Sequence, residues 1–177
     1  MKILVNVMLA VLLAGCAGPD VQQYKTVSPT LDPAEYFTGV TDAWGMFQKR
    51  DGEVTKRFHV VITGTQQQGV LTLDERFRYD DGTTQQRVWR LVNDGQGRWR
   101  GTAADVEGEA QGTAAGNALR WQYTLLLPVD GTTYAMQFDD WMFLIDRCTM
   151  INRASMRKFG IEFGQVTLTF RRRACNP

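Results

Sequence analysis

The sequence is poor in the residues that most catalytic and metal-binding sites require. It contains one histidine and three cysteines among 177 residues. The chain has no glycine-rich phosphate loop, no zinc-ligand spacing and no nucleophile elbow. His59 is out of phase with the apolar residues Phe58 and Val60, which places it on the outer face of a predicted strand. We therefore expect that the protein is not an enzyme and that it holds neither a cofactor nor a metal ion.

An excess of charge and a long apolar segment are also missing. The 20 basic and 19 acidic residues nearly cancel, whereas a nucleic-acid-binding domain usually presents a basic face. We therefore expect no nucleic-acid partner. The apolar segment at residues 3–13 is about half as long as the roughly 20 residues that a membrane-spanning helix needs, which argues against a transmembrane span.

This short apolar segment has the organisation of a secretory signal peptide, with Lys2 before it and small residues after it. The motif Leu13-Ala14-Gly15-Cys16 resembles the lipobox of bacterial lipoproteins. The resemblance implies cleavage before Cys16 and acylation of this cysteine, which would attach the protein to a membrane. Residue 17 is alanine rather than aspartate, and the sorting rule of enteric lipoproteins then implies the periplasmic face of the outer membrane. The predicted organisation is a signal peptide at 1–15, a lipidated tether at 16–32 and one β-barrel domain at 33–177.

After the tether, apolar and polar residues alternate with the period of two that is typical of strands with one buried face. Asp-Gly and Gly-Asn turn sequences separate these runs at hairpin spacing. Only Pro33–Phe37 and residues 155–159 favour a helix. The pattern predicts an all-β antiparallel chain of about 8 to 10 strands. An up-and-down meander that closes into a lipocalin-like barrel or half-barrel is favoured because closure removes exposed edges. A two-sheet β-sandwich is the alternative.

Two turns also predict the register of their hairpins. A three-residue turn at 80–82 pairs Tyr79 with Thr83 and therefore sets Glu75 opposite Arg87. A two-residue turn at 130–131 sets Trp121 opposite Asp140. A shift of one residue would place the apolar side chains of either hairpin on the wrong face.

These registers place charged groups on mostly apolar faces. One hypothesis is that they line a pocket and orient the polar head of a ligand, with aromatic walls around it. The candidate ligand-binding residues are Glu75, Arg87, Trp89, Trp121, Tyr123 and Asp140. The alternatives are a structural ion pair at the end of the barrel and tryptophans that fill a solid core.

Cys148 and Cys175 remain once Cys16 is acylated. An oxidising periplasm favours a disulfide between them. A chain reversal near residues 160–162 would bring the two cysteines together. Two unpaired thiols are the alternative.

Several segments along the mature chain resemble a family of proteobacterial lipoproteins catalogued as domain of unknown function 3833. The family has no established activity, so the resemblance supplies no catalytic residues, and the cysteine pair is not part of its pattern. The segments are Asp-Ala-Trp-Gly at 42–45, Arg-Phe at 57–58, Leu-Asp-Glu at 73–75, Tyr-Asp-Asp-Gly at 79–82, Arg-Val-Trp at 87–89, 116–121, 127–131, 138–142, Ile-Asn-Arg at 151–153 and 156–160.

Together these features predict an outer-membrane lipoprotein that binds an amphiphilic small molecule, such as a fatty acid or lipid, without enzymatic activity. The alternative is an envelope scaffold with a solid barrel that binds a protein partner, and an enzyme acting on lipid-like substrates comes third. A ligand binder should contain a cavity of roughly several hundred cubic ångströms that Glu75 or Arg87 reaches.

Overall fold

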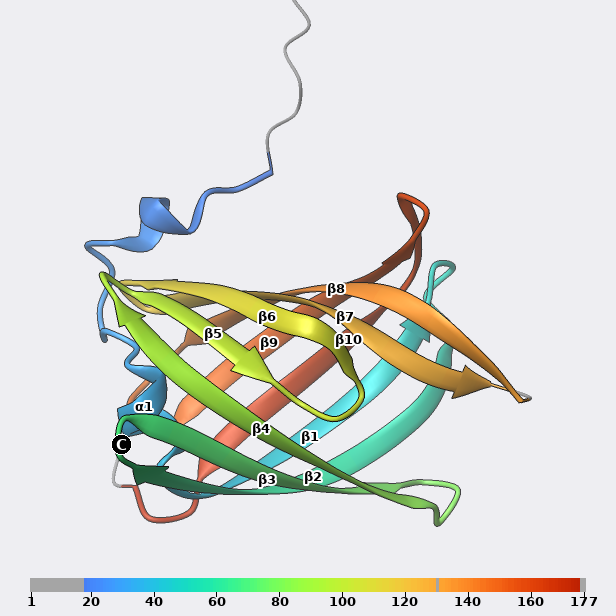
Figure 1. Ribbon diagram of the computed structural model, residues 1–177, viewed down its shortest axis with the longest axis horizontal. Helices are drawn as coiled ribbons and strands as arrows, with labels where there is room; N and C mark the ends of the chain where they lie inside the picture. Colours follow the sequence, from blue (N-terminus) through green and yellow to red (C-terminus); the bar gives the residue numbers. More distant parts are fainter. Residues whose placement is uncertain (1–17, 130, 176–177) are drawn as a thin grey trace, which may run out of the picture.

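The chain folds into a closed barrel of ten antiparallel strands (Figure 1). The computed structural model describes residues 18–129 and 131–175. Each strand pairs with its neighbours in the sequence, and β1 pairs with β10 to close the barrel. The elements are η1 (Val21–Tyr24), α1 (Pro33–Phe37), β1 (Gly39–Lys49), β2 (Val54–Gln67), β3 (Val70–Tyr79), β4 (Thr84–Gly95), β5 (Arg98–Thr102), β6 (Val106–Ala115), β7 (Ala118–Val129), β8 (Thr132–Leu144), β9 (Thr149–Lys158) and β10 (Ile161–Arg172).

The predicted lipocalin-like barrel is confirmed, and closure rules out the two-sheet sandwich. The β1–β10 ladder runs from Thr41 opposite Arg172 to Lys49 opposite Gly164. The two predicted hairpin registers are also present, with Glu75 opposite Arg87 and Trp121 opposite Asp140. Between the register shifts of the β1–β2, β4–β5, β6–β7 and β9–β10 ladders, the inward side chains come from alternate positions, and they form one main core.

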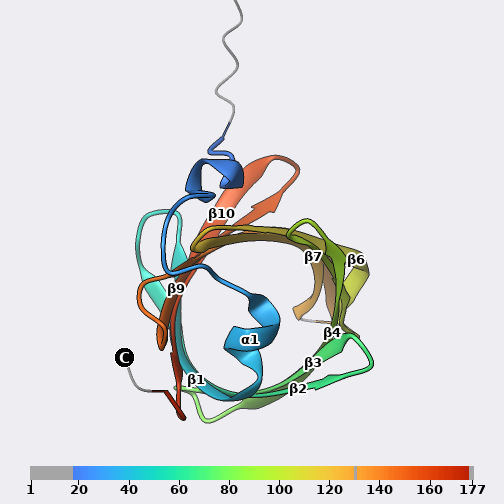
Figure 2. The same cartoon turned by 90° about the vertical axis from the view of Figure 1, so that its left-hand side faces the viewer.

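Helix α1 lies across one end of the barrel (Figure 2). The Asp32 carboxylate caps it by accepting hydrogen bonds from the N–H groups of Ala34 and Glu35, at 2.7 and 3.2 Å. Phe37 at its C-terminal end packs into the core and onto the ring of Phe170. The backbone of α1 comes so close to β2 that a Cβ atom at Gly64 would overlap the carbonyl oxygen of Phe37. Glycine at this position therefore lets the helix close the barrel end.

Two expectations for local structure need correction. Residues 155–159 are not helical, because β9 continues to Lys158 and pairs with both β8 and β10. The hydrogen bonds of two neighbouring strands outweigh the local helix preference of this segment. Residues 16–32 were expected to form a tether, but the segment packs against the barrel from Val21 onwards. Val21 and Leu31 are buried, and the N–H of Leu31 donates to the carbonyl of Gly116. The sequence pattern missed this packing because isolated apolar residues make it.

Within the described ranges, no helix has the length and apolar character needed to cross a membrane.

Candidate functional site

The barrel encloses a cavity of about 170 Å³. Pro33 and Phe37 of α1 line it at the closed end, and it is walled by the inward side chains of the strands. At the other end it meets a recess of about 690 Å³, which we call the vestibule. Cavity and vestibule share Phe47, Tyr79, Gln85 and Leu127 as lining residues. The inner cavity has room for roughly a dozen water-sized groups, which is less than most ligand pockets offer, and the vestibule supplies the remaining space.

Aromatic side chains form much of the cavity wall. Trp89 and Trp121 meet edge to face with their ring centroids 5.7 Å apart, and Trp89 meets Tyr123 in the same way at 5.3 Å. Tyr123 stacks on Phe138 across the β7–β8 ladder with centroids 5.1 Å apart. Such contacts hold large rings in fixed positions. The structure therefore brings together the three aromatic residues that the sequence proposed for a ligand site.

A buried cluster of charges lies among these rings. Arg87 is held in a bidentate pair by Asp105, with its Nε 3.0 Å from Oδ1 and its Nη2 2.8 Å from Oδ2. Glu75 lies opposite Arg87 as predicted, but its Oε2 atom is 3.9 Å from Nη1 of the arginine. Asp105 is therefore the closer partner. Burial opposes the charge of Arg87, but Asp105 and Glu75 together hold its pKa above the ordinary value.

Asp105 reaches Arg87 because β5 is short. The β4–β5 ladder covers only Arg90 to Gly95, so the first half of β4 has no partner in β5. β5 ends at Thr102 and β6 begins at Val106, so Asp105 lies in the loop between them. Figure 1 shows how the chain reverses direction between β5 and β6. The ion pair thus spans the gap between β4 and β6. The role of Asp105 could not be predicted, because nothing in its local sequence distinguishes it from a surface turn residue.

A second polar group is formed by Asp140 and Asn152. Both residues line the cavity and are almost fully buried, with 6% and 3% of their surface exposed. Asn152 donates from Nδ2 to Oδ2 of Asp140 over 3.3 Å. Oδ1 of Asp140 and Oδ1 of Asn152 have no hydrogen-bond partner among the described residues. The cavity wall therefore contains two buried acceptor atoms that have no partner among the described residues.

Both carboxyl groups of the cavity have raised pKa values. Burial raises the pKa of Glu75 to about 7, against the opposing effect of Arg87. Burial likewise raises the pKa of Asp140 to about 7, although the hydrogen bond from Asn152 lowers it. Near neutral pH these groups can therefore change protonation state, and the protonated form of each can donate a hydrogen bond.

These shifts predict that the protein loses stability as the pH rises from about 5 to about 7. In this window the folded chain keeps protons that the unfolded chain has released, so each group lowers the free energy of unfolding by about 1.4 kcal/mol per pH unit. Urea unfolding at several pH values would measure the slope. The double variant Glu75→Gln, Asp140→Asn should have a flatter slope. A slope equal to that of the wild type would show that other groups cause the pH dependence.

His59 does not line the cavity. His59 is on the outer face, where its Nε2 is 2.9 Å from Oδ1 of Asp42 and its ring stacks on Trp44. Cys16 lies outside the described residues. The described residues contain no group of three or more His, Cys, Asp or Glu side chains placed to hold a metal ion.

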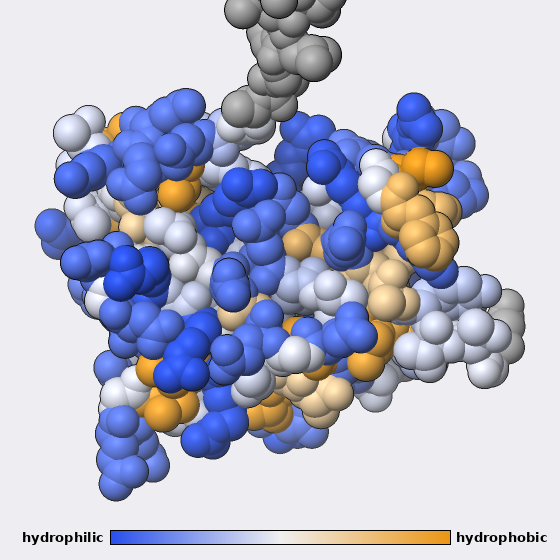
Figure 3. Space-filling model, turned by 45° about the horizontal axis from the view of Figure 1, so that its top comes forward, coloured by the Kyte–Doolittle hydropathy of each residue, from blue (hydrophilic) through white to orange (hydrophobic). Residues whose placement is uncertain are grey.

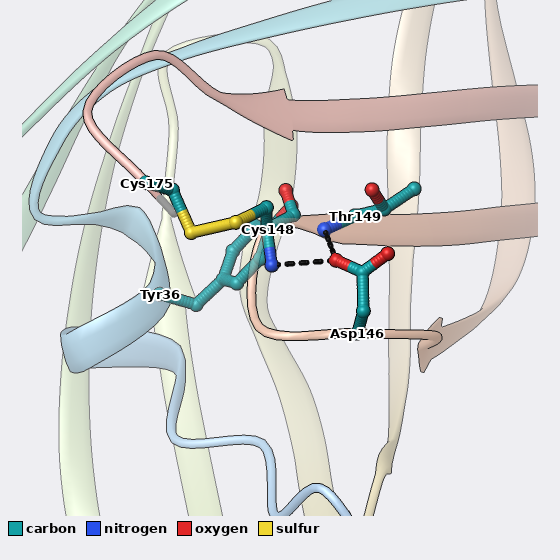
Figure 4. Close-up of a disulfide and its surroundings, with 5 residues drawn as sticks. All are labelled: Tyr36, Asp146, Cys148, Thr149 and Cys175. Carbon is teal, nitrogen blue, oxygen red and sulfur yellow. Dashed lines mark hydrogen bonds between the residues drawn. A yellow bond between two sulfur atoms is a disulfide. The ribbon is translucent and has the colours of Figure 1, made fainter. Parts of the chain in front are cut away.

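Cys148 and Cys175 form a disulfide at the closed end of the barrel, with their Cα atoms 5.6 Å apart (Figure 4). The hydroxyl of Tyr36 in α1 donates to the carbonyl of Cys148 over 3.1 Å. Asp146 accepts hydrogen bonds from the N–H groups of Cys148 and Thr149. The disulfide therefore links the C-terminal segment to the β8–β9 loop, and the hydrogen bond from Tyr36 connects this loop to α1.

The family model described as "Protein of unknown function (DUF3833)" matches residues 10–172. The chain belongs to this family. A search of curated proteins finds no significant match. Among solved structures, the barrel is similar to the S-type phycobiliprotein lyase CPES from Guillardia theta, with 6% identity, a TM-score of 0.58 and coverage of 80% of this chain and 92% of that chain. It is also similar to Rv2717c from M. tuberculosis, with 14% identity, a TM-score of 0.58 and coverage of 81% and 99%.

The comparison corrects the expectation that this protein is not an enzyme. A protein described as a lyase has a similar barrel, so the missing catalytic motifs do not exclude enzymatic activity in this DUF3833 chain. At 6% identity the likeness shows the fold alone. It therefore assigns no reaction to this chain.

Proposed function

We propose that this DUF3833 protein binds an amphiphilic small molecule, such as a fatty acid or lipid, inside its barrel. The observation that carries the proposal is an aromatic-walled cavity that contains buried polar groups and meets a wide vestibule. Mostly apolar walls with a few polar groups are the usual composition of small-molecule sites.

The arrangement favours one orientation of the ligand. Its polar group would lie near Glu75, Arg87 and Asp140, and its apolar part would contact Trp89 and Trp121. Arg87 is already neutralised by Asp105, so a carboxylate would have to compete for it. A hydroxyl or amide group could instead donate to the acceptors of the cluster. Part of a long ligand would extend into the vestibule.

We also propose that the chain is a lipoprotein of the outer membrane that faces the periplasm. The support is the signal-peptide organisation of residues 1–15, the lipobox-like cysteine Cys16 and the alanine at position 17. A lipid anchor would place the barrel next to a source of amphiphilic molecules. Metabolic labelling with a fatty acid, lost in the Cys16→Ser variant, would test the acylation.

Parinaric acid, a fluorescent fatty acid, provides a test of the cavity. We expect it to bind and to receive excitation energy from Trp89 and Trp121. Leu127 lines both the cavity and the vestibule, so Leu127→Trp should narrow the passage and weaken binding by about tenfold or more, equal to roughly 1.4 kcal/mol.

Thr124→Trp provides the matched control, because it adds the same side chain to the opposite face of β7, where Thr124 does not line the cavity. It should bind the probe like the wild type. Equal affinities for all three proteins would place the probe outside the barrel and reject the proposal. If only Leu127→Trp weakens binding, native mass spectrometry of the Cys16→Ser protein isolated from the periplasm would identify any natural cargo.

A further inference from the structure

Three large apolar side chains are exposed together around the turn between β9 and β10. Phe159 is 90% exposed, Ile161 56% and Phe163 53%. Lys158 lies beside them, with its Nζ 5.3 Å from the Phe159 ring centroid and 4.1 Å from that of Tyr134. We call these five residues the tip cluster.

Phe159 has a backbone conformation that is unfavourable for phenylalanine. Phe159 has a φ of +51° and Gly160 one of +76°. Both central residues are therefore left-handed, a conformation that Asn and Gly adopt easily and a bulky aromatic residue rarely adopts. A phenylalanine that is both in this conformation and almost fully exposed adds nothing to folding that asparagine would not supply better. A residue whose backbone conformation lowers the stability of the fold is typical of a functional position.

The tip cluster lies next to the vestibule and on the same side of the barrel as the N-terminal segment. Phe163 lines the vestibule, so the cluster lies at the rim of the open end. Figure 3 shows an apolar patch on the part of the molecule that projects at the upper right. Figures 1 and 2 agree that the β9–β10 hairpin projects on the same side of the barrel as the segment running from η1 back to residue 18.

We propose that the tip cluster inserts into the surface of a lipid bilayer and brings the rim of the vestibule next to it. Exposed aromatic and aliphatic side chains beside a lysine fit the membrane interface, where rings enter the headgroup region and the ammonium group stays in water. Five residue steps separate position 16 from the buried Val21, and they span at most about 18 Å. A lipid at Cys16 would therefore hold this side of the barrel close to the same bilayer. The insertion itself requires neither a ligand nor acylation.

The test uses the full chain carrying Cys16→Ser and vesicles of phosphatidylethanolamine and phosphatidylglycerol. We expect the double variant Phe159→Asn, Ile161→Ser to bind these vesicles about tenfold more weakly than its parent, because two apolar side chains are lost. Its thermal stability should be equal or higher, because asparagine suits the left-handed position. The control variant Val88→Ser, Ile145→Ser removes two exposed apolar side chains elsewhere and should bind like the parent.

A second measurement shows which part of the barrel contacts the bilayer. It does not depend on the N-terminal segment, which is the same in all variants. A tryptophan placed by Phe159→Trp should be quenched by brominated lipids, and one placed by Ile145→Trp should not. Equal quenching at the two positions, or vesicle binding unchanged by the hairpin variant, would overturn the proposal and leave the cluster as a site for a protein partner. Failure of parinaric acid to bind the barrel would not affect either result.

Discussion

Replacing Arg87 by methionine is expected to lower the free energy of unfolding by about 3 kcal/mol, because removing one partner of a buried ion pair leaves the remaining charges uncompensated. The Arg87 side chain is only 11% exposed and balances both Asp105 and Glu75. Its pair with Asp105 also connects β4 to the β5–β6 loop, where β4 has no hydrogen-bonded partner in β5. Urea unfolding followed by tryptophan fluorescence would measure the loss.

Two further variants separate the effect of charge from that of packing. Arg57→Met removes an arginine that is 74% exposed and pairs with Asp80, so it should cost less than about 1 kcal/mol. Adding Glu75→Gln and Asp105→Asn to Arg87→Met should recover much of the lost stability, because neither of the two carboxylates that Arg87 balances then remains charged and buried. If the triple variant were as unstable as Arg87→Met, the arginine would act through its packing against Phe77 rather than through charge.

Removing the disulfide with Cys148→Ala and Cys175→Ala is expected to cost about 3.5 kcal/mol, because the closed loop restricts the unfolded chain. The two cysteines are 27 residues apart in the sequence. The same change should follow from adding a reductant to the wild type. Urea unfolding of both proteins, with and without reductant, would measure it. Each protein should carry Cys16→Ser so that no third thiol can exchange.

Tyr36→Phe provides a control at the same barrel end. It removes the hydroxyl that donates to Cys148 but keeps the ring and the disulfide, so its cost should be about 1 kcal/mol. Matching urea midpoints for the oxidised wild type and the double cysteine variant would contradict the expected contribution of the disulfide.

The sequence predicted those features that depend on neighbouring strands. The turns at 80–82 and 130–131 set the registers of their hairpins, and strict alternation then assigned Glu75, Trp89 and Asp140 to the inside. These positions could be predicted because a shift of the hairpin register by one residue would expose the whole apolar face of the strand to solvent.

Other parts of the site depend on contacts that alternation does not encode. Asp105 becomes important only because β5 ends early, and Asn152 only because its strand turns that face into the cavity. The closure by α1 requires a near contact between Phe37 and Gly64, which are 27 positions apart in the chain. Local patterns carry no information about such contacts, so Glu75, Arg87 and Asp140 were predictable, whereas their partners Asp105 and Asn152 were not.

The closure of one barrel end by α1 also has a kinetic consequence. Among the described residues, α1 covers that end and the vestibule lies at the other. A bound molecule then has to withdraw through the passage by which it entered, and a second molecule cannot push it out from behind. Exchange of contents would be dissociative, with a rate set by departure of the first occupant and independent of how much competitor is present.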